Sequence, residues 1–218
     1  MEPKESINYV DKAFEGDSGS IEYYDKISVD YDQGMKKDEY RGPELMIQFC
    51  LDHLKQKDFK ILDLGAGTGR LGQLLKEAGF RKLDGLDGSA RMLEIAKEHG
   101  IYQEYFVEIL EPNQPVKSVP PGSYDAVVTV GTFAPNHLSK DHLLSVVRLV
   151  RPGGLFIIGM RKRWAEEAVP EFHWTESDRI GPKLKELEDG KVWKRLDSRI
   201  YPGYVAEDEG LFNVYEIL

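Results

Sequence analysis

The chain has 218 residues, and its 38 acidic and 29 basic side chains give a net charge of −9. With no visible basic stripe, this charge argues against a nucleic-acid partner, because nucleic-acid binding normally needs a basic face. Cys50 is the single cysteine, which excludes an internal disulfide and a cysteine metal cluster and favours a reducing, cytoplasmic location. We expect no metal site, and no membrane partner either, because no long apolar run or signal-peptide pattern is visible.

The first part of the chain is polar and then becomes rich in tyrosine. Residues 1–20 are polar and mixed, and we expect them to be partly disordered. Residues 21–37 carry tyrosines and acidic side chains, and we expect a helix followed by a loop. Pro43 suits the first turn of a further helix over residues 43–54. The sequence therefore predicts a helical segment over residues 21–54, ahead of the first strand.

A glycine-rich turn is the most informative feature of the sequence. Residues 60–64 form the pattern of a short buried strand, and apolar residues recur at helical spacing over 71–78. Gly65, Gly67 and Gly69 stand between the two. Glycines let the backbone turn with positive φ and let a ligand lie against the main chain. The N-terminus of the following helix adds N–H groups that can donate hydrogen bonds to a polar ligand. We therefore expect a cofactor loop here.

The glycine spacing bears on which cofactor binds. A dinucleotide loop reads G-x-G-x-x-G, and its third glycine would fall at position 70, where Arg70 stands. The strand before the loop carries Asp63, so the pattern is D-x-G-x-G-x-G. This spacing argues against an NAD-dependent oxidoreductase, which stays a less favoured alternative. A turn whose glycines serve packing alone is the other alternative.

A second acidic residue, Asp87, ends the next predicted strand, residues 82–86. Parallel strands end at the same edge of a sheet, so Asp87 is expected beside the glycine loop. A carboxylate there can accept hydrogen bonds from both hydroxyls of a ribose. Ser89 can cap the helix over residues 90–99, which leaves Asp87 for a ligand.

The rest of the chain continues the alternation of strands and helices. We expect strands at 104–107, 124–130 and 155–160, helices at 139–150 and 175–189, and a closing antiparallel pair at 192–201 and 211–218. The basic run at 161–163 is expected to be a solvated strand end. Alternating strands and helices predict an α/β fold with a mostly parallel, doubly wound sheet. Without repeats or a dividing linker, residues 21–218 are expected to form one domain.

These motifs together resemble the class I S-adenosylmethionine (AdoMet) methyltransferases, over about residues 20–218. The resemblance rests on residues 63–69, on Asp87, on Tyr-Asp-Ala-Val at 124–127 and on Arg-Pro-Gly-Gly-Leu at 151–155. Shorter runs are similar to the methyltransferase-like protein family of the Williams–Beuren syndrome region. They are Tyr23-Tyr24-Asp25, Tyr31-Asp32-Gln33, Tyr40-Arg41-Gly42-Pro43, Leu86-Asp87-Gly88-Ser89 and Met92-Leu93.

The resemblance implies a fold, an activity and a cofactor. The fold is Rossmann-like, with a seven-stranded, mostly parallel sheet, an antiparallel C-terminal strand and helices on both faces. The cofactor is AdoMet, and the product is S-adenosylhomocysteine. The tyrosines of the N-terminal helical segment, about residues 21–54, can reach a polar ligand, so we expect residues 20–41 to form a lid that closes over the cofactor; a helix packed permanently on the domain is the alternative. A non-catalytic AdoMet-binding partner protein stays open as an alternative.

The resemblance also implies cofactor-binding residues. They are Tyr31, Arg41, Asp63, Gly65, Ala66, Gly67, Gly69, Asp87, Gly88, Ser89, Met92, Glu108, Ile109, Val130 and Gly131. Asp63 would help to hold the amino end of the cofactor, and Arg41 is a candidate partner for its carboxylate. Glu108 stands where family members often place an aspartate that reaches the adenine amino group. Val130 and Gly131 would offer backbone carbonyls to the cofactor amino group.

The acceptor is less well specified. His137 follows the fourth predicted strand, where the acceptor pocket of this fold opens, and histidine can titrate near neutral pH. It is a candidate general base, and a locally packed loop histidine is the alternative. His173, Trp174 and Tyr201 are candidates for the substrate wall, with Tyr204 a further one.

Some acceptors can be argued against. Methyltransferases of exocyclic amino groups often carry a D/N-P-P-Y/F motif after the fourth strand, and residues 130–133 read Val-Gly-Thr-Phe instead. Together with the acidic charge, this favours a small-molecule acceptor, with a protein side chain as the alternative. The sequence leaves open whether oxygen, nitrogen, sulfur or carbon is methylated, and it leaves the oligomeric state open.

Overall fold

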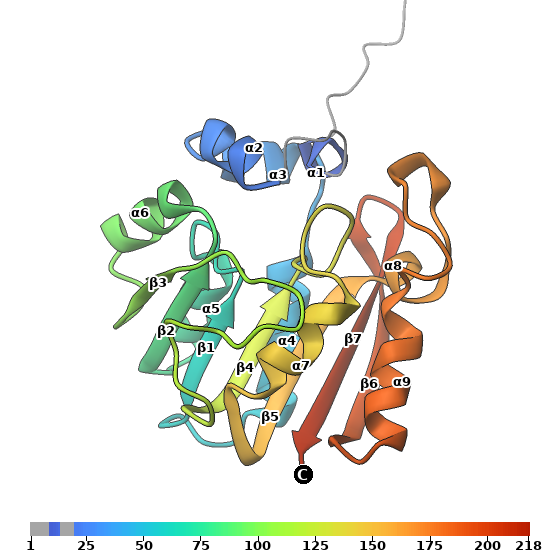
Figure 1. Ribbon diagram of the computed structural model, residues 1–218. Helices are drawn as coiled ribbons and strands as arrows, with labels where there is room; N and C mark the ends of the chain where they lie inside the picture. Colours follow the sequence, from blue (N-terminus) through green and yellow to red (C-terminus); the bar gives the residue numbers. More distant parts are fainter. Residues whose placement is uncertain (1–8, 14–19) are drawn as a thin grey trace, which may run out of the picture.

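The computed structural model describes residues 9–13 and 20–218, and within them a seven-stranded sheet forms the centre of the molecule (Figure 1). The strand order is β3-β2-β1-β4-β5-β7-β6. The strands are β1 Lys60–Leu64, β2 Lys82–Asp87, β3 Tyr105–Val107, β4 Tyr124–Val130, β5 Val150–Arg161, β6 Trp193–Val205 and β7 Asp208–Ile217. Strand β7 runs antiparallel to both of its neighbours, and the pairs among β1 to β5 are parallel. The predicted Rossmann-like sheet with an antiparallel C-terminal strand is confirmed.

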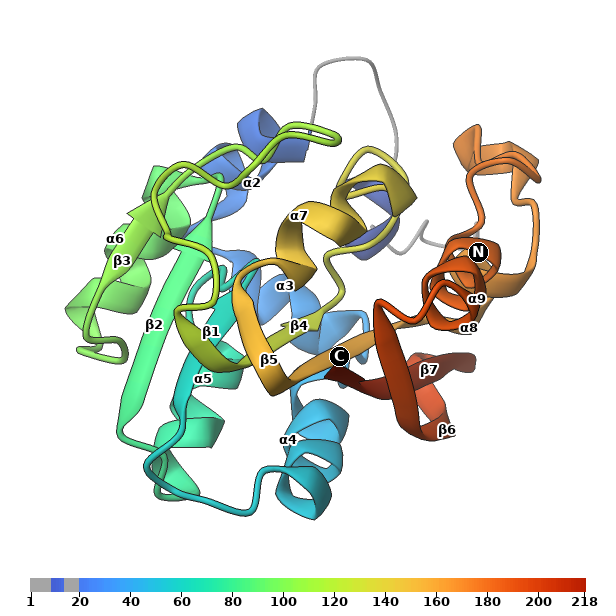
Figure 2. The same cartoon turned by 60° about the horizontal axis from the view of Figure 1, so that its bottom comes forward.

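Helices cover both faces of this sheet. The α-helices are α1 Tyr9–Lys12, α2 Ser20–Ile27, α3 Tyr31–Lys37, α4 Gly42–His53, α5 Arg70–Glu77, α6 Ala90–Glu98, α7 Leu143–Val147, α8 Lys162–Glu166 and α9 Ile180–Asp189, and two 3-10 turns are η1 Lys140–His142 and η2 Pro170–Phe172. Helices α4, α5 and α6 share one hydrophobic cluster with the sheet, and α7, α8 and α9 share the other. Figure 2 shows α4 and α5 on one side of the strands and α7 on the other.

Strand β1 shows why the sheet needs both layers. Successive side chains of a strand point to opposite faces. Ile61 belongs to the cluster beneath α4 and α5, whereas Leu62 and Leu64 belong to the cluster beneath α7. All three are buried, as expected for a central parallel strand that is covered on both faces. The same alternation decides which way Asp63 points, because it shares a face with Ile61.

The N-terminal helices occupy a third position, over the carboxyl ends of the parallel strands (Figure 1). The helix and loop expected at residues 21–37 are two helices, α2 and α3. Helix α4, by contrast, packs on the sheet, and Cys50 on it is fully buried as a free thiol. A backbone bridge between Tyr40 and Val205 ties the connection to the edge hairpin. The sequence predicts that residues 1–20 are partly disordered, and most of them lie outside the residues that the structure describes. Of those that it does describe, residues 9–12 form α1.

Two predicted helices are shorter than expected. Ser139 caps a turn as predicted, but that turn is η1, and α7 ends at Val147. The strand then begins at Val150, which pairs with Tyr124 ahead of a register shift. Helix α9 starts at Ile180 because the expected first turn is an irregular loop, in which the Thr175 hydroxyl and main-chain N–H both donate to the Asp178 carboxylate.

The basic run after β5 is not a solvated strand end. Arg161 is 3% exposed and pairs with Asp11 of α1 at 2.7 Å and with Asp208 of β7 at 3.3 Å. Its guanidinium also lies over the Trp164 ring. The expectation was wrong for Arg161 because α1 lies over this strand end and supplies a carboxylate, which a charge pattern alone does not reveal.

Candidate active site

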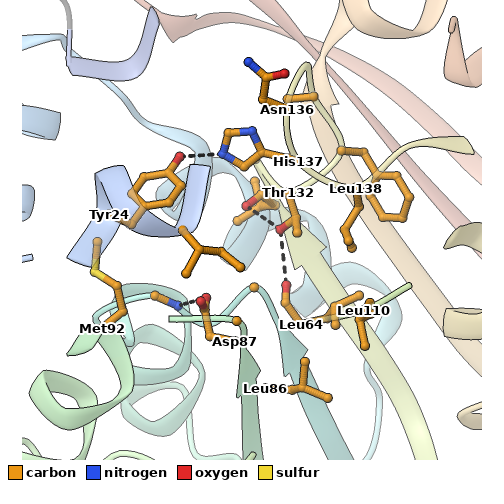
Figure 3. A pocket seen from close by; sticks show the side chains of 18 of the residues that line it. Tyr24, Leu64, Leu86, Asp87, Met92, Leu110, Thr132, Asn136, His137 and Leu138 are labelled. Carbon is orange, nitrogen blue, oxygen red and sulfur yellow. Dashed lines mark hydrogen bonds between the residues drawn. The ribbon is translucent and has the colours of Figure 1, made fainter. Parts of the chain in front are cut away.

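A pocket of about 240 Å³ lies at the carboxyl edge of the sheet, beneath α2 and α3 (Figure 3). Eleven of the predicted site residues line it. They are Tyr31, Gly65, Gly67, Asp87, Gly88, Met92, Glu108, Ile109, Val130, Gly131 and His137. They come from the ends of β1, β2, β3 and β4 and from the helices and loops that follow. The structure thus brings the glycine loop, the second acidic residue and the candidate base to one cavity.

The three loop glycines have different roles in the structure. A Cβ on Gly65 would collide with Thr132, and one on Gly69 would collide with Ile101, so both allow close packing. Gly67 has φ +54°, lines the pocket, and a Cβ built on it would meet no atom within 4 Å. Its bare backbone therefore faces open space in the pocket. A ligand can lie against this backbone, which is what a cofactor loop requires.

Asp87 organises the same end of the pocket. One carboxylate oxygen accepts the main-chain N–H of Gly67 at 2.8 Å, and the other accepts that of Ser89 at 2.8 Å. Burial raises the pKa of Asp87, and the bonds from Ser89 and Gly67 oppose that shift. Ser89 caps α6 as predicted, because its Oγ accepts the N–H of Met92 at 3.1 Å. The carboxylate thus connects the loops after β1 and β2.

Asp63 lies behind the pocket and does not line it. Its side chain is on the α5 face of the sheet, where it is 3% exposed. The Tyr102 hydroxyl donates to its carboxylate at 2.6 Å. Burial, reinforced by the charge of Asp87, raises the pKa of Asp63 to about 7. A direct contact with the amino end of the cofactor is therefore not what this geometry favours, because strand alternation turns the side chain away.

The raised pKa of Asp63 predicts a pH-dependent cost in stability. The folded pKa lies above the unfolded value, so ionising this carboxyl destabilises the fold as the pH rises toward 7, and the full cost remains above it. An Asp63→Asn variant keeps an acceptor for Tyr102 without the charge. Its free energy of unfolding, relative to wild type, should rise by about 2 kcal/mol from pH 5.5 to pH 8.5. Urea denaturation at both pH values measures this difference, and a difference independent of pH would contradict it.

Asp125 is a control for Asp63, because its pKa shifts in the opposite direction. Partial burial works against its charged form, but bonds from the Lys60 main-chain N–H and from Arg151 outweigh this and lower the pKa of Asp125. A depressed pKa gives stability that is present above the unfolded pKa and is lost as the pH falls. Asp125→Asn should therefore destabilise the protein at both pH values used for Asp63→Asn.

Glu108 lines the pocket but is bonded to a loop. Its two carboxylate oxygens accept the main-chain N–H groups of Lys117 at 2.8 Å and Ser118 at 2.7 Å. Although burial opposes the shift, these bonds lower the pKa of Glu108. Ile109, 59% exposed, stands beside it at the rim. Glu108 therefore holds the proline-rich loop after β3 against this end of the pocket.

His137 lies at the opposite end, in the loop after β4 (Figure 3). Its Nδ1 is 2.7 Å from the Pro135 carbonyl oxygen, so Nδ1 carries the proton and donates. Its Nε2 is 2.7 Å from the Tyr24 hydroxyl and accepts from it. Burial lowers the pKa of His137 to about 4. The ring is therefore neutral near pH 7, with its free electron pair directed toward Tyr24.

Three side chains of α2 and α3 bond to the loops around the pocket. Asp25 accepts the Ser89 hydroxyl at 2.5 Å, after β2. Asp32 accepts the Thr68 hydroxyl at 2.8 Å, in the glycine loop. Tyr24 donates to the loop after β4, as described above. The two helices are thus attached to the loops after β1, β2 and β4, which carry most of the predicted cofactor residues and the candidate base.

Several predicted residues lie elsewhere in the described part of the chain. Arg41, Ala66, Gly69 and Ser89 flank the pocket without lining it, and His173, Trp174 and Tyr201 are also absent from its lining. Trp174 is 5% exposed and donates its indole N–H to the Trp164 carbonyl. Tyr201 packs its ring on Phe212. A bridge between Val169 and Trp174 folds the segment of His173 and Trp174 back on α8, and the place of these three residues in a substrate wall stays a prediction.

Sequence reasoning did not assign other residues of the lining to the site. These are Ile21, Tyr24, Met35, Tyr40, Leu64, Leu86, Leu110, Thr132, Phe133, Ala134, Asn136, Leu138, His142, Arg161 and Trp164. Tyr24 and Tyr40 stand in runs shared with the methyltransferase-like family, which is a signal that could have pointed to them. Tyr204, a minor candidate, does line the pocket, and its hydroxyl is 3.5 Å from that of Tyr40.

Residues 9–13 and 20–218 show neither a membrane-spanning helix nor a cluster of metal-ligating side chains. No helix there is long and apolar enough to cross a membrane. In the same residues, no group of three or more histidine, cysteine, aspartate or glutamate side chains is placed to hold a metal ion.

Comparisons with known proteins agree with this geometry. The methyltransferase domain family matches residues 61–154. Methyltransferase-like protein 27 of Homo sapiens is 33% identical over 178 residues, which cover 81% of this chain and 69% of that protein.

Solved structures share the fold. A chain of the complex between the Trm112 methyltransferase activator of Haloferax volcanii and a methyltransferase superposes with TM-score 0.64 at 14% identity, over 90% of this chain and 96% of that one. The 1,6-didemethyltoxoflavin-N1-methyltransferase of Burkholderia thailandensis, with S-adenosylhomocysteine bound, gives 0.58 at 18% identity, over 93% and 92%. The chain therefore belongs to the class I AdoMet-dependent methyltransferases, in the family of methyltransferase-like protein 27.

Proposed function

We propose that this methyltransferase modifies a small-molecule acceptor, which binds in the pocket between His137 and the cofactor. The observation that carries the proposal is the enclosure of the pocket by α2 and α3, whose side chains bond to the loops after β1, β2 and β4. A pocket covered in this way suits a small ligand better than a nucleic acid or a folded protein. The net charge of −9 supports the same choice.

The residues divide between two ends of the pocket. AdoMet, when bound, supplies a methyl group made electrophilic by a positively charged sulfur. Asp87 would accept hydrogen bonds from the ribose hydroxyls, and the open backbone at Gly67 would meet the methionine part. Met92, buried in the lining, would pack near the adenine. Val130 and Gly131, at the end of β4, would place their carbonyls toward the amino group.

The acceptor end excludes water and positions the nucleophile. Leu110, Phe133 and Leu138 contribute apolar surface there. Much of the rate of a methyl transfer can come from holding the acceptor in line with the bond that breaks. His137 and His142 both line the pocket, and His137 is the one whose Nε2 accepts a hydrogen bond from another lining side chain, Tyr24. We also place the protein in the cytoplasm, which suits its single, unpaired cysteine.

A screen of acceptors tests the proposal. The protein is incubated with AdoMet and either the dialysable or the macromolecular fraction of a cell extract, and S-adenosylhomocysteine is measured. Turnover with the dialysable fraction is expected. Turnover with the macromolecular fraction alone would contradict the small-molecule proposal. A protein that binds AdoMet but gives no turnover with either fraction would support the non-catalytic alternative.

We further propose that residues 20–41 form a lid that closes over bound cofactor. Asp25 and Asp32 bond to Ser89 and Thr68, which neighbour the residues expected to touch the cofactor. Bound cofactor should fix these loops and so strengthen the attachment of α2 and α3. Hydrogen exchange at backbone amides of residues 20–41 should slow when S-adenosylhomocysteine is added. Helix α9, far from the pocket, serves as the control, and equal protection of residues 20–41 in both states would refute the lid.

A further inference from the structure

We propose that Tyr24 and His137 form a proton relay, and that the acceptor is therefore a molecule whose nucleophile carries a removable proton. The proposal rests on the proposed function, because it assigns a chemical class to the same acceptor. The class comprises hydroxyl, thiol and N–H nucleophiles. It leaves out tertiary amines and other nucleophiles without a proton.

The hydrogen bonds around His137 give the relay its direction. The Pro135 carbonyl can only accept, so it fixes the proton on Nδ1 of His137. Nε2 is then an acceptor, and the Tyr24 hydroxyl must donate to it. With its own proton committed, the Tyr24 oxygen keeps electron pairs that can accept a hydrogen bond. Both side chains line the pocket, so an acceptor X–H can donate to Tyr24 from inside it.

The relay depends on closure of α2 over the pocket, because its two side chains belong to different elements. Tyr24 is on α2, whereas His137 is in the loop after β4. The Tyr24 ring lies edge-on to both the His137 ring, at 5.4 Å between centroids, and the Tyr31 ring, at 5.8 Å. These contacts fix the hydroxyl against Nε2. The relay is therefore complete only while α2 lies over the pocket.

The other charged groups of the lining are already engaged. Asp87 and Glu108 accept main-chain N–H groups, two each. Arg161 is paired with Asp11 and Asp208. Among the residues that the structure describes, the acceptor end therefore offers no unengaged charge to an ionised nucleophile, so a hydroxyl, thiol or N–H acceptor would bind there with its proton and lose it as it gains the methyl group.

The step balances in atoms and charge. The acceptor atom X forms a bond to the methyl carbon, and the bond from that carbon to the sulfur breaks, leaving its electron pair on the sulfur. The proton of X moves to the Tyr24 oxygen while the Tyr24 proton moves to Nε2 of His137. The positive charge that began on sulfur ends on the imidazolium, which still donates Nδ1–H to Pro135. A hydroxyl, a thiol or a non-basic N–H group that has gained a methyl group is a far stronger acid, so even a weakly basic histidine can take its proton.

Nuclear magnetic resonance of the histidine nitrogens tests the geometry without any acceptor. In ¹⁵N-labelled full-length protein with S-adenosylhomocysteine, His137 should be neutral with the proton on Nδ1, and Tyr24→Phe should shift its Nε2 resonance. His142 is an internal control of the opposite tautomer, because its Nδ1 accepts the Ser139 N–H at 3.0 Å. The His137→Gln variant assigns the signals. A proton on Nε2 of His137 would overturn the relay.

Kinetics with 4-substituted phenols test the chemistry. Tyr24→Phe and His137→Gln should lower kcat by roughly a hundredfold for 4-methylphenol. The loss should be smaller for 4-nitrophenol, which is largely ionised at pH 8, and the affinity for S-adenosylhomocysteine should stay within about threefold of wild type. Tyr23→Phe removes a hydroxyl one residue away and is the matched control, since Tyr23 is not among the lining residues. An equal loss for both phenols would indicate a structural role and would overturn the relay.

The two proposals can fail separately. If the wild-type protein does not turn over these phenols, the tautomer of His137 decides whether the relay stands. A protein with the expected tautomer that methylates only macromolecules would refute the small-molecule acceptor and keep the relay. A protein that methylates small molecules with Nε2 of His137 protonated would refute the relay alone.

Discussion

Gly67→Val should abolish detectable binding of S-adenosylhomocysteine by a protein that remains folded. Gly67 lines the pocket, and a Cβ built on it would meet no protein atom within 4 Å. The branched side chain would therefore stand in the space where the cofactor meets the backbone, and no other side chain would have to move to admit it. Isothermal titration calorimetry measures the binding, and circular dichroism checks the fold.

Gly100→Val is the matched control for this variant. Gly100 has φ +58°, close to the +54° of Gly67, and its Cβ would also meet nothing within 4 Å. It follows α6 and does not line the pocket. Both variants should lose about 1–3 kcal/mol of stability from the strained backbone, but only Gly67→Val should lose binding. Normal binding by Gly67→Val would show that the cofactor does not approach this glycine.

The parts of the fold that could be predicted are those with local signals. A short apolar run and the glycine turn place β1 and the start of α5 within a residue or two of their observed bounds. The end of β2 at Asp87 and the cap at Ser89 are equally local, because each depends on neighbouring residues alone. The confirmed fold class, a mostly parallel sheet with helices on both faces, follows from the alternation of strands and helices. Much of the cofactor end of the pocket was therefore predictable, because it is built from strand ends.

The rest depends on contacts between distant segments. Arg161 is buried by α1, more than a hundred residues earlier in the chain, and nothing near it in the sequence announces this. Trp174 was placed in the substrate wall by analogy, and its bridge to Val169 turns it into the core. Asp63 is a different case, because the strand alternation that turns it away from the pocket is visible in the sequence. Tyr24 reaches His137 only through the position of α2, which no local pattern fixes.

Asp87→Ala should weaken binding of S-adenosylhomocysteine by roughly 1–3 kcal/mol, because the ribose hydroxyls lose a charged acceptor. The same substitution leaves the main-chain N–H groups of Gly67 and Ser89 without the acceptor they have in the structure. Part of the loss could then come from a rearranged loop, so a second variant is needed. Asp87→Asn keeps one oxygen that can accept from either N–H and removes the charge.

The comparison of the two variants separates ribose binding from loop support. A carboxylate that binds two hydroxyls should lose most of its effect in Asp87→Asn as well, because an amide has one acceptor oxygen and no charge. A carboxylate that only supports the loop should be replaced by asparagine with a smaller loss of affinity, because the amide oxygen keeps one of the two main-chain bonds while the amide nitrogen faces the other N–H. Asp125→Ala, at the opposite end of the sheet and outside the lining, controls for a general loss of stability. Unchanged affinity in a folded Asp87→Ala protein would rule out the ribose assignment, whatever the asparagine variant does.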